Sequence, residues 1–238
     1  HHDDALLMAD QTFLLKRLIK NCARQFNMNA SFMAKPFSDE AGNGMHVHLS
    51  VVDKDGNNVF TMDKNKQPQG LFSHAIGGLL KTTPDFLSFY APHSNSYRRL
   101  VHNGDHAPTT LSWGNENRTA LIRLPEASAE ATRLEFRVAS ADSNPYLVFA
   151  SVLASVYAGI QGKLQHDKET IGNAHAQHPP SLGVTWREAV EKTSVSSLVK
   201  DFFGEQFQQC YTCVKESEIQ RFESTITDFE YHSYLRSL

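Results

Sequence analysis

Charged and apolar residues alternate at positions 133–138, and this run carries the strongest chemical signal in the sequence. Successive side chains of a β-strand point to opposite faces, so Arg133, Glu135 and Arg137 would share one face and the apolar residues between them the other. Such a row of charges is compatible with a solvated surface. The alternative is a site in which one carboxylate lies between two guanidinium groups.

A second alternating run, residues 45–52, places His46, His48 and Ser50 on one face of another strand. If the two strands are neighbours, imidazoles come close to the carboxylate of Glu135. An imidazole and a carboxylate are suitable ligands for Mg²⁺ or Mn²⁺, although hard divalent cations prefer more oxygen ligands than this pair supplies. We therefore expect a metal site that the two strands share.

Arginine is concentrated in the central region of the chain. Its members there are Arg98, Arg99, Arg118, Arg123, Arg133 and Arg137. Guanidinium groups match phosphate and carboxylate oxygens in bidentate geometry, and a cluster beside a metal suits phosphoryl transfer. The sequence has neither a Walker-type glycine-rich loop nor the protein-kinase signature. Arginines and metal would therefore hold the phosphates, whereas Arg98 is expected to form a structural ion pair.

The elements that must position these residues follow from periodicity and turn signals. Asn144 and Pro145 have the residue types of an N-cap and a first helical position, so they predict the start of a helix. In the first half of the chain we expect a helix over 5–26, a strand over 45–52 with a hairpin turn at 55–58, and a helix over 70–83 that ends near Pro84, with further helical sequence to Tyr90. A long functional loop over 92–112 and strands over 120–124 and 133–138 follow. The helix that begins at Pro145 should extend over 145–164, and residues 186–238 should be mostly helical.

Composition and charge restrict the classes of partner. A formal net charge of −3 gives no electrostatic reason to expect nucleic acid or an anionic membrane. No run of about 18 apolar residues predicts a membrane span. Cys210 and Cys213 have no second pair to complete a structural zinc site, so we expect them to pack on one helix face. The sparse cysteines fit a reducing, cytoplasmic location.

Seven segments in order resemble the glutamine synthetase family, from about residue 5 to residue 165. Those segments are residues 29–36, 44–48, 95–100, 117–118, 122–125, 133–137 and 144–147. One such segment would be weakly specific, but seven in the family's order are highly specific. The C-terminal region, including residues 222–227, looks most like the γ-glutamylputrescine and γ-glutamylpolyamine synthetase branch.

The resemblance implies an α+β fold: one catalytic domain over residues 1–238, with a curved antiparallel β-sheet lining an active-site funnel and helices outside it. It implies an ATP-dependent ligase that joins the γ-carboxylate of L-glutamate to an amine through γ-glutamyl phosphate, with Mg²⁺ or Mn²⁺. Relatives assemble as homo-oligomers of stacked rings. The family's N-terminal β-grasp domain and four glutamate metal ligands would lie upstream. We therefore expect the chain to be an incomplete portion, inactive by itself.

The resemblance also assigns roles residue by residue. It implies His46 and Glu135 as metal ligands, His48 and Ser50 as nucleotide contacts, and Arg118, Arg123 and Arg133 as the phosphate clamp. The glutamate site would consist of Gly42, Arg99 and Arg137, with Arg99 binding the α-carboxylate. Arg118 and Arg137 would be catalytic residues.

Two departures from the family pattern affect the expected substrates. Ammonia-using relatives carry a glutamate where this chain has His106, preceded by Asp105, and both residues are candidate catalytic groups here. Losing the carboxylate weakens selection for a cation as small as ammonium, which favours a bulkier amine. The loop between Pro125 and Arg133 is short and acidic, and a nucleotide-facing lysine of many relatives has no counterpart in it. The alternatives are an ordinary glutamine synthetase and a non-catalytic structural or regulatory relative.

Overall fold

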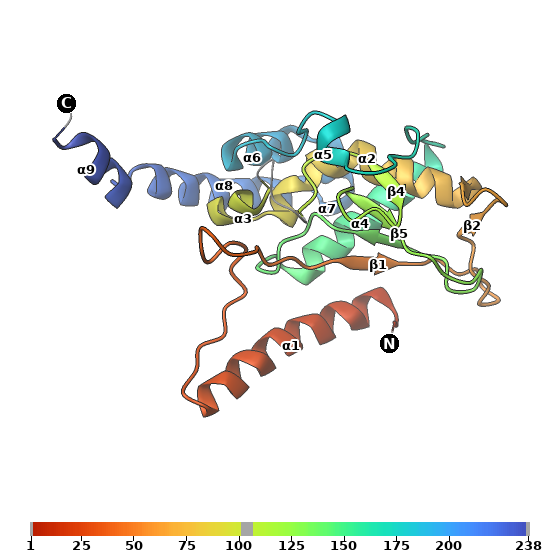
Figure 1. Ribbon diagram of the computed structural model, residues 1–238, viewed down its shortest axis with the longest axis horizontal. Coiled ribbons are helices and arrows are strands. Elements are labelled where there is room, and N and C mark those ends of the chain that lie inside the picture. The colour runs from red at the N-terminus through yellow and green to blue at the C-terminus, as the bar shows by residue number, and fades with distance from the viewer. Residues whose placement is uncertain (1, 101–106, 237–238) are drawn as a thin grey trace.

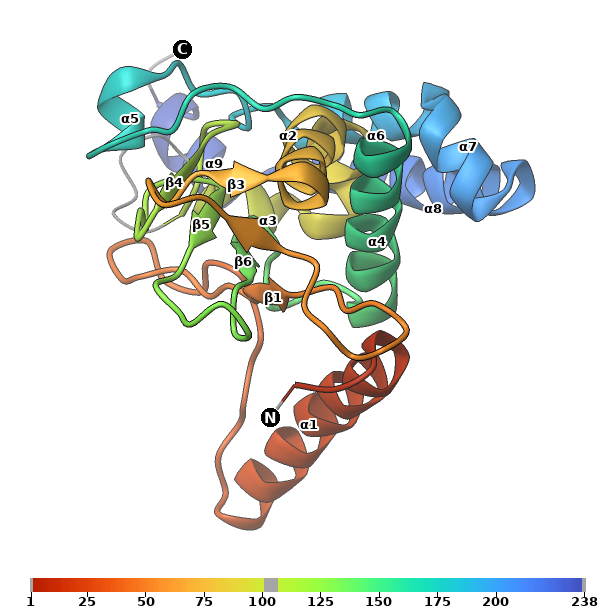
Figure 2. The ribbon, with the colours of Figure 1, turned by 90° about the vertical axis from the view of Figure 1, so that its right-hand side faces the viewer.

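The computed structural model describes residues 2–100 and 107–236, and it places a four-stranded sheet against a group of helices (Figure 1). Helices α2 and α4, Gly70–Tyr90 and Pro145–Gln161, lie side by side next to this sheet (Figure 2). Both helices contribute to the apolar core, with buried residues that include Phe72, Ile76 and Val148. The expected combination of helices with a sheet is confirmed.

The main sheet has the strand order β1-β6-β5-β4. Its members are β1 Val47–Leu49, β4 Trp113–Asn115, β5 Ile122–Leu124 and β6 Leu134–Phe136. β6 pairs antiparallel with β1 and β5, but β4 and β5 run parallel. The sheet is therefore mixed rather than wholly antiparallel, and β4 was not among the expected strands. A separate short pair, β2 Thr61–Met62 with β3 Pro68–Gln69, follows the hairpin that residues 55–58 predict.

The strands expected over 45–52, 120–124 and 133–138 are shorter than predicted, and larger differences lie around helix α2 and the loop after it. α2 continues through Pro84 to Tyr90, although proline breaks isolated helices because it lacks an N–H and crowds the preceding turn. Burial of Phe86, Leu87 and Phe89 in the core outweighs that cost. Helix α3, Ser94–Arg99, occupies part of the region that was expected to be a loop.

Helix α4 begins as its sequence predicts. The side chain of Asn144 accepts hydrogen bonds from the backbone N–H groups of Tyr146 and Leu147, and Pro145 is the first helical residue. α4 then crosses α2 at a point where Gly78 faces Gly159. A Cβ at either glycine would overlap the backbone of the other helix, so only glycine permits this close approach.

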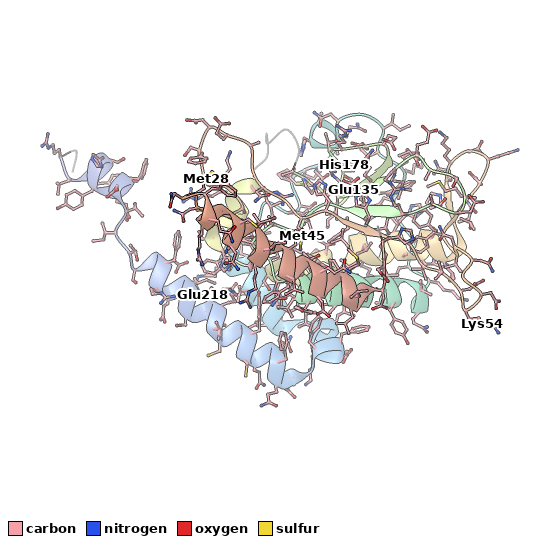
Figure 3. All side chains as sticks on the ribbon, turned by 90° about the horizontal axis from the view of Figure 1, so that it is seen from below. Met28, Met45, Lys54, Glu135, His178 and Glu218 are labelled. Atoms are coloured by element: carbon pink, nitrogen blue, oxygen red, sulfur yellow. The ribbon has the colours of Figure 1, made fainter. Side chains whose placement is uncertain are left out.

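The C-terminal region is helical, as expected. Its helices are α6 Trp186–Val195, α7 Ser197–Phe203, α8 Glu205–Glu223 and α9 Asp228–Tyr234, and the short helix α5, Ala174–Gln177, precedes the expected region. α8 packs against α6 and α7, and in Figure 3 its C-terminal end and α9 extend away from the body. Cys210 and Cys213 lie on α8 as free, exposed thiols, so the expected packing of these two side chains is wrong.

Helix α1, Ala5–Gln25, is also found where the sequence predicts it, on the lower side of the molecule in Figure 1. It contacts α4 through the rings of Phe13 and Tyr146, whose centroids are 6.1 Å apart. Ala9 is its one buried residue. In the described part of the chain, every helix is too short or too polar to cross a membrane.

Candidate active site

Strand pairing brings together three functional residues that lie far apart in the sequence. In the register of the sheet, Glu135 on β6 lies opposite His48 on β1 and opposite Arg123 on β5. Residues directly opposite each other on neighbouring strands share a face of the sheet. An imidazole, a carboxylate and a guanidinium therefore form a row across three strands.

The Glu135 carboxylate is the centre of this row and is only 3% exposed. Its Oε2 accepts from Nη1 of Arg123 at 2.7 Å, and its Oε1 lies 2.9 Å from Nδ1 of His46. Nη1 of Arg137 also donates to Oε1. The two candidate metal ligands, His46 and Glu135, are thus in direct contact, as the two alternating runs predict.

The electrostatics of the row keep its carboxylate ionised. Burial alone would raise the pKa of Glu135, but the hydrogen bonds from His46 and Arg123 and the charge of Arg137 hold it far below the ordinary value. The pKa of His48 is lowered, first by burial and then by the charges of neighbouring cations, while Glu135 opposes the shift. His48 is therefore neutral at pH 7 and can accept a hydrogen bond.

Arg133 supplies that hydrogen bond, from its Nε to Nδ1 of His48 at 3.3 Å. Beyond the histidines lies a cavity of about 1340 Å³, which His46, His48 and Ser50 line together with the start of α1 and the hairpin after β1. The arginines are not among its lining residues. The histidines therefore stand between a large cavity and a charged cluster.

Arg118 lies in the connection between β4 and β5, with an exposed side chain. Its positive charge is one of the factors that lower the pKa of Arg137, after burial and the charge of Arg123. It is thus close enough to act on the cluster electrostatically. Asn117 anchors the connection by donating to the carbonyl oxygens of Thr170 and Gly172 at 2.7 and 2.8 Å.

Arg99 is placed differently from the other arginines. It is 7% exposed, and its Nη1 and Nη2 donate to the backbone oxygens of Val138 and Arg137 at 2.8 and 3.0 Å. Gly42 and Gly44 pack on it so closely that a Cβ at Gly42 would be 3.0 Å from its Cγ. In this structure Arg99 supports the backbone beyond β6, and its predicted contact with glutamate stays a prediction.

Asp105 and His106, the other two candidate catalytic residues, lie outside the described residues. Their roles stay predictions.

Sequence reasoning missed one member of the cluster, Glu116. Its Oε2 accepts from Nη2 of Arg123 at 2.6 Å, so Arg123 bridges two carboxylates, Glu116 and Glu135. The available signal was its position two residues before Arg118 in the same segment. That signal is weak, because the bond depends on a turn that brings the end of β4 beside β5.

His46 and Glu135 can account for only part of a metal site. Within residues 2–100 and 107–236, no three or more His, Cys, Asp or Glu side chains are grouped closely enough to hold a metal ion. Mg²⁺ is commonly held by one or two protein ligands together with substrate phosphates and water. The pair fits this kind of shared site and does not fit a closed site made by protein alone.

Comparisons with known proteins identify the family of the chain. The family "Glutamine synthetase, catalytic domain" matches residues 1–234. The chain is 34% identical over 237 residues to gamma-glutamylputrescine synthetase PuuA of Escherichia coli, covering 100% of this chain and 50% of that protein. It is also 34% identical over 229 residues to gamma-glutamylethanolamide synthetase GlnA4 of Streptomyces coelicolor, covering 96% and 48% respectively.

A glutamine synthetase of Thermotoga maritima is 34% identical over 245 residues, with 98% of this chain and 55% of that protein covered. The chain thus spans about half the length of the curated relatives it matches. A solved structure described as "Apo GmaS without ligand" superposes with a TM-score of 0.88 at 28% identity, covering 98% of this chain and 54% of the other. The chain belongs to the glutamine synthetase family and has the fold of its catalytic domain.

Proposed function

We propose that the whole protein is an ATP-dependent ligase that joins the γ-carboxylate of L-glutamate to an amine. The observation that carries this proposal is the contact of His46 with Glu135, held on the same sheet face as Arg123 and Arg137. A carboxylate that can bind a cation is here surrounded by groups that bind phosphate. Because the chain spans about half the length of its relatives, the complete reaction belongs to the whole protein.

The reaction needs two anions, a carboxylate and a triphosphate, to approach each other. The γ-carboxylate of glutamate attacks the γ-phosphorus of ATP, the bond to the bridging oxygen breaks, and ADP leaves with its electron pair. The amine then attacks the carbonyl carbon of γ-glutamyl phosphate, loses a proton and displaces inorganic phosphate. Fixed guanidinium groups such as Arg118, Arg123 and Arg133 would offset the charge on the transferring oxygens without reorganisation.

His46 and Glu135 would hold a divalent cation, Mg²⁺ or Mn²⁺, together with the phosphates of ATP. When bound, the cation screens the phosphate charge and polarises the phosphorus–oxygen bond. Glu135 already has hydrogen-bond partners on both oxygens, so a cation would share the carboxylate with Arg123 and Arg137 or displace His46 from it. The neutral imidazole of His48 and the hydroxyl of Ser50 would contact the nucleotide from the same cavity.

Gly42, Arg99 and Arg137 are the proposed glutamate site. Arg137 is best supported, because it lies in the cluster and contacts Glu135. To reach the α-carboxylate, Arg99 would need to break or share one of its hydrogen bonds to the backbone oxygens of Val138 and Arg137.

A larger amine is our preferred second substrate over ammonia. The support is the replacement of a glutamate by His106, which removes a charge partner for ammonium, although Asp105 could substitute for it. Two of the relatives are named for putrescine and ethanolamide products, and others are named glutamine synthetase. The whole protein is further proposed to assemble as a homo-oligomer, which light scattering after gel filtration would test.

The test is a phosphate-release assay of the whole protein with glutamate, ATP, Mg²⁺ and a panel of amines that includes ammonia. The expected result is a γ-glutamyl amide, identified by mass, formed faster from a diamine or amino alcohol than glutamine is from ammonia. Arg123→Met should reduce kcat/KM by at least about a hundredfold, as expected for loss of a fixed group that stabilises transition-state charge. The control is Arg187→Met, whose exposed side chain pairs with Glu223.

If the protein forms glutamine faster than any other γ-glutamyl amide, the second substrate is ammonia and not a larger amine. If no amine supports phosphate release and the protein binds no ATP, the non-catalytic alternative is favoured.

A further inference from the structure

Glu116 has a backbone conformation that its residue type does not favour. It follows β4 directly, and its φ is 50°, in the left-handed region where a side chain is strained and glycine is not. Its own N–H donates to the backbone oxygen of Leu124 at 3.0 Å, so the turn is fixed from within the sheet. Strained backbone that the surroundings hold in place is often found at functional sites.

The side chain at this strained position makes two bonds in different directions. Oε2 accepts from Nη2 of Arg123 at 2.6 Å, and Oε1 accepts from the backbone N–H of Glu126. Glu126 is near the start of the loop between β5 and β6, and it pairs at 2.8 Å with Lys66, which lies between β2 and β3. One carboxylate therefore ties the arginine of β5 to the loop that follows it.

The effect on Arg123 is to fix its plane. Nη1 is held by Glu135 and Nη2 by Glu116, with the guanidinium between them. With Glu135 alone, the guanidinium could rotate until both of its Nη atoms met the same carboxylate, which is the preferred arrangement of an isolated pair. Two separate carboxylates prevent this rotation. The hydrogen bonds from Arg123 and from the backbone N–H of Glu126 hold the pKa of Glu116 below its usual value, so Glu116 is ionised at neutral pH.

We propose that Glu116 is a positioning residue that holds Arg123 in the orientation in which Arg123 binds phosphate. The proposal rests on the proposed function, in which Arg123 belongs to the phosphate clamp. It explains why a strained position carries glutamate, since glycine would relieve the strain but leave Arg123 held on one side only. The opposite role, in which Glu116 occupies Arg123 and competes with phosphate, predicts the reverse change in affinity.

The experiment compares Glu116→Gly and Glu116→Gln in the whole protein. The matched control is Lys163→Gly, because Lys163 has a φ of 47°, is exposed and lies beyond the end of α4. Three quantities are measured: the thermal midpoint, the Kd for ATP with Mg²⁺ and for inorganic tripolyphosphate by calorimetry, and the KM values for ATP and glutamate.

Glu116→Gly and Lys163→Gly are both expected to keep or raise the thermal midpoint, because both relieve a strained φ. Its Kd for ATP and tripolyphosphate should rise about tenfold, the size of losing one hydrogen bond to a charged group. The KM for ATP should rise with it, while the KM for glutamate and the Lys163→Gly affinities stay unchanged. Glu116→Gln, which keeps an accepting oxygen, should show a smaller loss.

Unchanged or tighter binding by Glu116→Gly or Glu116→Gln would overturn the proposal. So would the absence of ATP and tripolyphosphate binding by the unmodified protein. The proposed function can fail separately. The protein could form no γ-glutamyl product and still bind tripolyphosphate, with weaker binding in Glu116→Gly. The positioning role of Glu116 would then hold without the ligase activity. If the protein is a ligase but its Glu116 variants bind ATP normally, the proposed function holds and the positioning role of Glu116 does not.

Discussion

Helices α1 and α4 begin in the same way but are packed very differently. Asp4 caps α1 and Asn144 caps α4, each by accepting hydrogen bonds from two backbone N–H groups of the first turn. α4 then buries eight of its residues, whereas α1 buries only Ala9 and exposes large apolar side chains such as Leu14 and Leu18. Equal local signals thus led to unequal tertiary packing.

The difference matters for the site, because the charged cluster rests on the well-packed region. The strands that carry Glu135 and Arg123 are backed by apolar residues with no exposure, among them Leu134 and Phe136. Helix α1 contributes its first residues to the wall of the cavity but little to the core. We therefore expect global stability to follow the sheet with α2 and α4, and α1 to be energetically separable from it.

The largest expected effect is that of truncating the core under the cluster. Phe136 lies in the middle strand pair with no exposed surface, and its ring centroid is 5.0 Å from that of Tyr90. Phe136→Ala should reduce the free energy of unfolding by about 3–5 kcal/mol, from lost burial and the cavity left behind. Urea denaturation followed by circular dichroism measures it.

The matched substitution in the other region is Phe26→Ala, at the C-terminal end of α1. Phe26 is 72% exposed, so the free energy of unfolding should change by less than about 0.5 kcal/mol. Similar losses for Phe136→Ala and Phe26→Ala would contradict the proposed difference between the two regions.

The second effect comes from the cluster itself. Glu135→Ala leaves the guanidinium groups of Arg123 and Arg137 without their shared buried carboxylate. Breaking a buried ion pair from one side costs about 3 kcal/mol or more. Glu126→Ala is the control, because Glu126 pairs with Lys66 in solvent and such pairs contribute about 0–1 kcal/mol.

The measurement is again the free energy of unfolding, here at pH 7 and in two salt concentrations. Salt should reduce the small effect of Glu126→Ala and leave that of Glu135→Ala nearly unchanged, because buried charges are screened less. A loss in Glu135→Ala no larger than in the control would show that the cluster has no net role in stability.

Local sequence patterns predicted much of the fold. The alternation at 133–138 and 45–52 gave two paired strands, and Asn144 with Pro145 gave the start of α4. The prediction failed where tertiary packing decided the outcome. Proline at 84 favours a helix end, but core burial on both sides of it keeps α2 continuous.

The site was predictable where side chains contact side chains on one sheet face. His46 and Glu135 meet as their strand positions indicate. It was not predictable where the backbone takes part. Arg99 donates to two backbone oxygens, and Glu116 reaches Arg123 only because its own φ is positive. No spacing of residue types encodes either contact.

The smallest expected effect tests the two N-caps directly. Asn144→Ala should lower the free energy of unfolding by about 1 kcal/mol, because α4 cannot fray without disturbing the core. Asp4→Ala removes the same kind of bond from α1, but its global effect should stay below about 0.5 kcal/mol, because local opening of α1 exposes little additional apolar surface.

Hydrogen exchange of backbone amides separates the two cases. In Asp4→Ala, the amides of α1 should exchange faster while those of α4 and β6 keep their rates. In Asn144→Ala, the slowest amides of α4 and of the sheet should accelerate together, since they open only with the global transition. If Asp4→Ala also accelerated β6, then α1 would belong to the same cooperative unit as the sheet, and the Glu135 cluster would depend on a helix that buries almost nothing.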